Sequence, residues 1–132
     1  MATFTTSSLA AKTHTIKAAY PGDDTFEPSS GSLKQVVDKY PTTTALRSSL
    51  NPSNYGQTVS FTATVTSAGP TPTGKVTFKD GTKSLQTVTL SGGVATYTTS
   101  KLAVGTHAIT ADYLGDAANA TSTSPVLDQV VQ

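Results

Sequence analysis

The sequence contains nearly the same fifteen-residue stretch twice. LAAKTHTIKAAYPGD begins at Leu9 and LAVGTHAITADYLGD begins at Leu102, which is a separation of 93 residues. The same shift places ATFTTS, near the start of the chain, on ATYTTS, and a shift of 94 aligns the segments that begin at Leu33 and Leu127. A period of this length exceeds the repeat of a solenoid or a propeller and is the size of a small domain. The sequence therefore predicts a tandem array of domains.

The repeat divides the chain into two unequal parts. Residues 41–132 have the length and pattern of one complete unit. Residues 1–40 correspond to the last three strands of such a unit, because only the second half of the repeat occurs twice in the chain. We therefore predict an incomplete unit over 1–40 and a complete domain over 41–132.

The complete unit has the pattern of β-strands throughout. In QTVSFTATVTS the apolar residues Val59, Phe61, Ala63 and Val65 alternate with serine and threonine, which is the period of a strand with one buried face. Turn signals rich in Gly, Pro and Asn recur about every ten residues, and no helical period is present. The prediction is an all-β fold: an immunoglobulin-like Greek-key β-sandwich of about seven strands, preceded by the C-terminal half of a second such unit.

The phrase SGGVATYTTSKLAVGTHAITADYLGD, within the series that runs from NYGQTVSFTATV to the end of the chain, resembles the bacterial immunoglobulin-like repeat family. The resemblance implies a module found in arrays within bacterial cell-surface and secreted proteins, which serves as spacer, stalk or adhesive scaffold. Lys12 stands where the second copy has Gly105, so that turn is expected to differ between the copies. Residues 24–27 are also more acidic than their counterparts 117–120.

The charge pattern excludes several classes of partner. The net charge is +1, only 13% of the residues are charged, and the nine Lys and Arg are spread singly, which argues against nucleic acid. No apolar run approaches the roughly 20 residues that span a bilayer, so no membrane insertion is expected, and the first residues lack the pattern of a signal peptide. Cysteine is absent, which excludes a disulfide scaffold and a thiolate site. No cofactor is expected.

The two histidines, His14 and His107, occupy the same position in the two copies. Each lies in register with Ile, Ala and Tyr, at the outer end of an inward-facing row, so we interpret both as residues at the edge of the core. Asp112 is five residues from His107 and therefore lies on the opposite face of the strand. A Ser–His–Asp constellation within this strand is excluded, no nucleophile motif occurs elsewhere, and the chain is not expected to be an enzyme.

Acidic residues follow the first copy of the phrase. Asp23, Asp24 and Glu27 could offer carboxylates to Ca²⁺, but the second copy keeps only Asp116. Both copies do keep Gly-Asp, at Gly22-Asp23 and at Gly115-Asp116, which is a turn signal because Gly allows a positive φ and Asp caps backbone N–H groups. The structural turn is the preferred interpretation, and a calcium site in the first copy is the alternative.

Two further features are interpreted as structural. Tyr20 and Tyr113 end an inward-facing row just before the Gly-Asp turn, where a tyrosine ring can pack and its hydroxyl can bond back to the chain. Pro41 fixes φ in a short connector without glycine, VVDKYPTTT, which predicts limited reorientation between consecutive units.

Residues 1–40 are expected to lack a partner within the chain. Three strands with one apolar face are marginal alone and leave core residues and sheet edges exposed. The face in question carries Phe4, Leu9, Ile16, Ala18 and Tyr20. We expect the chain to be a window of a longer array, or a filament subunit completed by another chain, with neighbouring repeats or copies of itself as partners.

The sequence thus favours a non-catalytic structural repeat of a bacterial extracellular or cell-surface array, acting as a stalk, a fibre or a scaffold for adhesion. One alternative is an adhesive module that binds a surface glycan or a host protein through its loops, where Phe26 and Tyr55 are the aromatic residues expected to be exposed. The other alternative is an accessory spacer domain of a secreted hydrolase.

Overall fold

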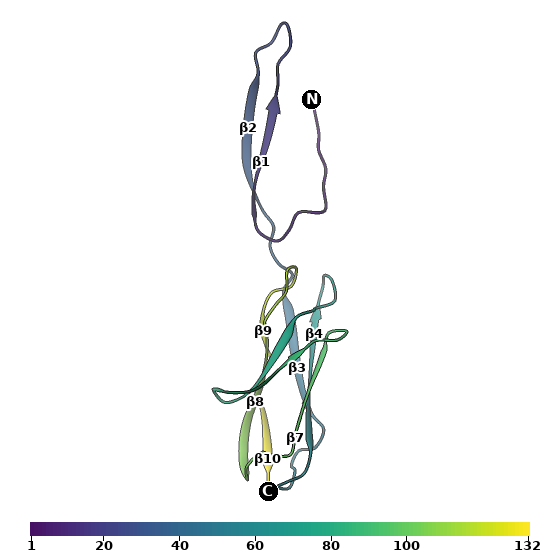
Figure 1. The fold of residues 1–132 in the computed structure, drawn as a ribbon, viewed down its shortest axis with the longest axis vertical. Helices are drawn as coiled ribbons and strands as arrows, with labels where there is room; N and C mark the ends of the chain where they lie inside the picture. The colour runs from purple at the N-terminus through teal and green to yellow at the C-terminus, as the bar shows by residue number, and fades with distance from the viewer. The chain divides into compact units, whose positions relative to one another are not determined.

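The computed structural model describes residues 1–132, which form ten β-strands and no helix (Figure 1). The chain divides into two compact units, Met1–Lys39 (unit 1) and Tyr40–Gln132 (unit 2). None of its segments is a helix of the length and apolarity that crossing a membrane requires.

Unit 1 is an antiparallel hairpin of β1 (Thr13–Tyr20) and β2 (Ser29–Val36). Residues 1–12 form no strand, although the sequence predicts one over residues 2–7. The counterpart of this segment in unit 2 is β7 (Val94–Thr99), and it explains the difference. β7 pairs with β4 (Val59–Ser67) and does not pair with the strands that correspond to β1 and β2. Because unit 1 contains no equivalent of β4, its first segment has no ladder to join.

Unit 2 is a sandwich of two antiparallel sheets. One sheet has the order β3 (Thr42–Ser48), β4, β7. The other has the order β10 (Leu127–Val131), β8 (Gly105–Tyr113), β5 (Lys75–Asp80), β6 (Lys83–Thr89), and β9 (Ser122–Thr123) also pairs with β8. The prediction of an immunoglobulin-like β-sandwich is confirmed. The strand number is eight because the last strand is interrupted between β9 and β10, around Pro125.

The core lies between the two sheets and follows the alternation of the sequence. Its buried residues come mainly from β4, β5 and β8: Val59, Phe61, Ala63, Val65, Val76, Phe78, Ile109, Ala111 and Tyr113. The Tyr97 ring packs against both phenylalanines, with ring centroids 6.4 Å from Phe61 and 5.8 Å from Phe78. Burying aromatic rings of this kind supplies much of the hydrophobic stabilisation of a small sandwich.

The hairpin of unit 1 has the strand register of β8 and its partners in unit 2. Leu33 lies opposite Ile16, and their counterparts Leu127 and Ile109 also face each other. Near the turn, Tyr20 lies opposite Ser29 just as Tyr113 lies opposite Ser122. The repeated sequence therefore builds the same strand pairing twice, with one extra residue accommodated between β9 and β10.

The burial of the two hairpins differs despite this common register. Ile109 is fully buried, whereas Ile16 is 37% exposed and Leu33 is 57% exposed. In unit 2 the second sheet covers the row that contains Ile109. In unit 1 the corresponding face borders an open hollow of about 570 Å³, whose apolar lining residues are Phe4, Leu9, Ile16, Leu33 and Val37.

Candidate functional site

The imidazole of His107 in unit 2 is held at both of its ring nitrogens. β8 directs it toward the end of β5, where its Nδ1 lies 2.6 Å from the Asp80 carboxylate, and its Nε2 lies 2.8 Å from the carbonyl oxygen of Ala103. A carboxylate and a carbonyl both accept hydrogen bonds, so this geometry suits an imidazolium that donates from both nitrogens. The Ala103 carbonyl and then the Asp80 carboxylate raise the pKa of His107 above its usual value.

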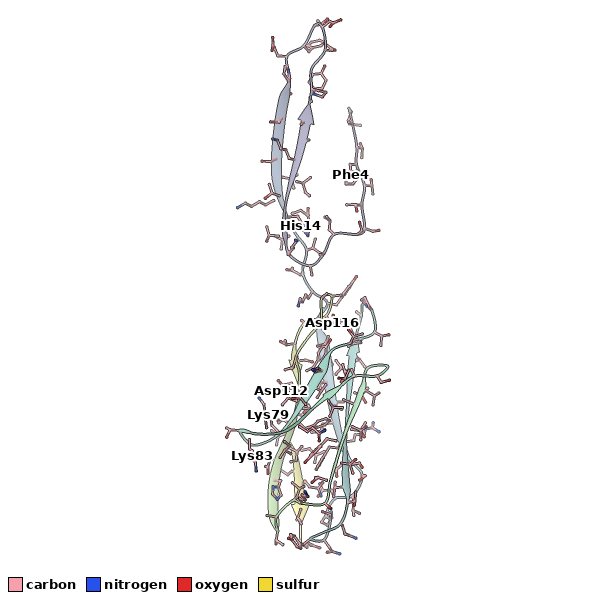
Figure 2. The ribbon with its side chains drawn as sticks, in the orientation of Figure 1. Phe4, His14, Lys79, Lys83, Asp112 and Asp116 are labelled. Carbon is pink, nitrogen blue, oxygen red and sulfur yellow. The ribbon has the colours of Figure 1, made fainter.

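This arrangement leaves His107 without a free ring nitrogen, so the imidazole has no lone pair with which to act as a general base. Asp112, the acid nearest to His107 in the sequence, points away and forms an ion pair with Lys79 of β5 (Figure 2). The contact with Asp80 could not be read from the sequence, because it depends on the pairing of β5 with β8, which places Asp80 opposite Ile109.

His14 reproduces half of this arrangement. Its Nε2 lies 2.7 Å from the carbonyl oxygen of Ala10, the counterpart of Ala103. It contacts no carboxylate, because unit 1 has no strand equivalent to β5. Both histidines are half-buried at the outer end of their strands. The preceding turn differs between the copies: Gly105 has a φ of 136°, and no residue other than glycine, Lys12 included, has a positive φ.

Asp116 joins two segments at one end of unit 2, its own turn and the segment that contains Thr73 (Figure 2). Its carboxylate accepts hydrogen bonds from the backbone N–H of Ala118 and Asn119 at 2.8 and 2.6 Å, from the Asn119 side chain, and from the N–H and hydroxyl of Thr73 at 2.9 and 3.0 Å. Desolvation opposes ionisation, but these donors outweigh it and hold the pKa of Asp116 well below its usual value. Gly115 precedes it with a φ of 81°, which a side chain at this position would strain.

Asp23 forms the same turn in unit 1. Its carboxylate accepts hydrogen bonds from the N–H groups of Thr25 and Phe26 at 2.8 and 2.7 Å, and these lower its pKa. Gly22 has a φ of 83°. The structure brings no three acidic or histidine side chains together anywhere in the chain, so Asp23, Asp24 and Glu27 do not form the set of ligands that the calcium alternative requires.

The two tyrosines before these turns have different surroundings. Tyr113 is buried, and its hydroxyl donates to the carbonyl oxygen of Thr73 at 2.8 Å. Desolvation and then the charge of Asp116 raise the pKa of Tyr113 to about 12. Tyr20, in contrast, is 43% exposed, and the prediction of a packed anchor is wrong for this copy. The hydroxyl of the equivalent Tyr113 bonds to the connection between β4 and β5, and unit 1 has no counterpart of this connection.

The remaining predicted residues lie on the surface. Pro41 is exposed between Tyr40 and the first residue of β3, and Phe26 and Tyr55 are 64% and 69% exposed. A hollow of about 370 Å³ with a mixed polar and apolar lining lies beside His107, with Lys83 of β6 and Lys101 among its lining residues. Its side chains include neither an unpaired buried base nor a cluster of acids, so its chemistry is that of a solvated surface.

The comparisons with known proteins agree with this architecture. The family model of the bacterial Ig-like domain (group 3) matches residues 46–132, which is more than half of the chain. Among solved structures, fibronectin(III)-like modules of Clostridium thermocellum CbhA are similar to it at 23% identity and a TM-score of 0.51, over 67% of this chain and 93% of that chain. No curated protein matches the sequence. The chain belongs to the bacterial Ig-like domain (group 3) family.

Proposed function

We propose that the chain is a non-catalytic structural module of a bacterial extracellular or cell-surface array, where it gives length and spacing to a stalk, a fibre or a scaffold. The observation that carries this proposal is the duplication itself: the residues kept in both copies are those that fix strand register and turns. The ionisable side chains support the proposal as well, because His107 and Asp116 are fully engaged in hydrogen bonds within the fold.

The proposal includes a partner for unit 1. In unit 2 the row that contains Ile109 is covered by the facing sheet, whose strands β3 and β4 belong to the front half of the same domain. The equivalent face of unit 1 has the same residue types in the same register, and it is open. A polypeptide equivalent to residues 40–93, from a neighbouring repeat or from a second subunit, has the shape and apolar pattern to cover it.

A chain carrying a second copy of residues 40–93 ahead of Met1 tests this partner. The proposal predicts that amide hydrogens of β1 and β2 become protected from exchange to the level of β8 and β10. Phe61→Ser in the added copy alone is the control, and it should abolish the gain. Unchanged exchange in the extended chain would contradict the proposed partner.

An adhesive function is the second candidate, supported by the exposure of Phe26 and Tyr55 at loops. Such a module would bind a cell-wall polysaccharide or a host matrix protein saturably. Phe26→Ala or Tyr55→Ala would then abolish that binding while the circular dichroism spectrum stays unchanged. Saturable binding with this loop dependence would replace the structural proposal, whereas its absence from a screen of both ligand classes supports it.

A further inference from the structure

A seam with a hydrogen-bonded zone at each end closes one side of unit 2, where residues 40–55 lie along residues 118–132. We propose that this seam is a mechanical clamp, which resists a force that pulls the two ends of unit 2 apart. The inference rests on the proposed structural function and adds to it the part of the fold that would carry tension between consecutive units.

At one end of the seam, Tyr40 forms a parallel bridge beyond β8. Its N–H donates to the Ala118 carbonyl, and the Ala120 N–H donates to the Tyr40 carbonyl, both at 2.8 Å. The Thr42 hydroxyl adds contacts to the carbonyl oxygen of Ala120 at 2.9 Å and to the Ser122 hydroxyl at 2.8 Å. The segment that enters unit 2 is therefore bonded side by side to the segment that leads into the last strands.

At the other end, a second parallel bridge joins Ser53 to the last strand. The Ser53 N–H donates to the Val130 carbonyl at 2.9 Å, and the Gln132 N–H donates to the Ser53 carbonyl at 2.8 Å. The Tyr55 N–H donates to the Gln132 carbonyl at 2.8 Å, and the Asn51 side chain accepts from the Val130 N–H at 3.0 Å. Between the two bonded zones, Leu46 and Leu127 border a hollow rather than a ladder.

The direction of the seam follows from strand pairing. β8 begins at Gly105, opposite Val131, and ends at Tyr113, next to the loop that holds Tyr40. The points at which the chain enters and leaves unit 2 therefore lie at opposite ends of this nine-residue strand, and β3 and β10 extend between them (Figure 1). A force on the two ends pulls residues 40–55 one way and residues 118–132 the other way, along the strands.

This geometry decides how the hydrogen bonds are strained. Ladder bonds stand across the strands, so sliding two parallel segments past each other strains all bonds of a zone together. Pulling the segments apart from one end breaks the same bonds one after another. The clamp thus predicts a resistance that depends on the direction of the force, in addition to the equilibrium stability, because forced unfolding is governed by the unfolding rate in the loaded direction.

Single-molecule force measurements on the full chain test the clamp. Handles at Met1 and Gln132 load the seam along its length, and handles at Asn54→Cys and Gln132 peel it from one end. The chain has no cysteine of its own, and Asn54 is exposed, so this attachment is specific. The clamp predicts a higher unfolding force end to end than in the peeling geometry, with a length gain of roughly 300 Å for the 93 residues of unit 2.

A pair of variants locates the resistance. Thr42 and Thr44 both contact Ser122 through their hydroxyls, whereas Thr43 between them is exposed. Thr42→Val with Thr44→Val should lower the end-to-end force and leave the peeling force unchanged, and Thr43→Val should change neither. Equal forces in both geometries, or equal losses in the double variant and in Thr43→Val, would overturn the clamp. Such a result would not decide the proposed structural function, which is tested separately by hydrogen exchange of the extended chain and by the binding screen described above.

Discussion

The two hairpins of this chain have the same strand register and the same turn, yet one is buried and the other is open. Ile109 has no exposed surface, and its counterpart Ile16 is 37% exposed. Local sequence is therefore sufficient to set pairing and turn geometry, while burial depends on strands that are distant in the sequence. The two copies serve as internal controls for each other, and most of the predictions below compare the same substitution in both.

Truncation of the equivalent isoleucines should give the largest difference. Ile109→Ala leaves a cavity in the core and should lower the free energy of unfolding of unit 2 by about 2–5 kcal/mol. Ile16→Ala removes a side chain with no covering sheet and should lower stability by about 0.5 kcal/mol or less. Urea unfolding followed by circular dichroism measures both. Similar losses in the two variants would show that the unit 1 face is covered.

Replacement of the turn aspartates should give the next largest effect. Asp116→Ala removes an acceptor that joins Thr73 to the turn, and hydrogen bonds to charged groups contribute about 1.5–3 kcal/mol, so unit 2 should lose stability on that order. Asp23→Ala should have a smaller effect, because Asp23 bonds only within its own turn.

The pH dependence of Asp116 checks the same contact. Because folding lowers its pKa, ionised Asp116 stabilises unit 2 above the usual value of 3.8, and this contribution is lost as the pH falls through the lower folded pKa. Denaturant unfolding between pH 7 and pH 2 should therefore show a smaller acid loss for Asp116→Ala than for the unmodified chain. Parallel curves would contradict the assignment.

Removal of the tyrosine hydroxyls should have a smaller effect. Tyr113→Phe deletes the bond to the Thr73 carbonyl and should cost about 1 kcal/mol. Tyr20→Phe should leave the unfolding curve nearly unchanged, since the Tyr20 side chain is exposed and its hydroxyl reaches only Asp23 of the adjoining turn. Thermal unfolding of the two variants side by side measures the difference, and a loss in Tyr20→Phe equal to that in Tyr113→Phe would argue for a packed Tyr20.

The histidine contacts should give the smallest change in stability. Because folding raises the pKa of His107, its contribution is present below the usual value of 6.5 and is lost as the pH rises through the higher folded pKa. Asp80→Asn should move the NMR titration midpoint of His107 to lower pH. His107→Gln should destabilise unit 2 at pH 6 more than at pH 8, and His14→Gln should leave unit 2 unaffected. An unchanged midpoint in Asp80→Asn would exclude the ion pair.

The sequence predicted the features that depend on near neighbours and missed those that depend on strand order. The alternation around Phe61 was enough to place β4 and its buried face, since one strand carries the whole signal. The contacts of His107 with Asp80 and of Asp116 with Thr73 join residues 27 and 43 positions apart, and no local pattern specifies them. The expected strand over residues 2–7 failed for the same reason, because its partner is absent from unit 1.

Hydrogen exchange of the unmodified chain, read by NMR for each amide, tests the central claim most directly. The account predicts that the hydrogen-bonded amides of β8 and β10 exchange only through global unfolding of unit 2, whereas those of β1 and β2 exchange through local opening, at rates close to those of an isolated hairpin. Equal protection of the two hairpins would contradict it, because unit 1 would then be stable without a covering sheet.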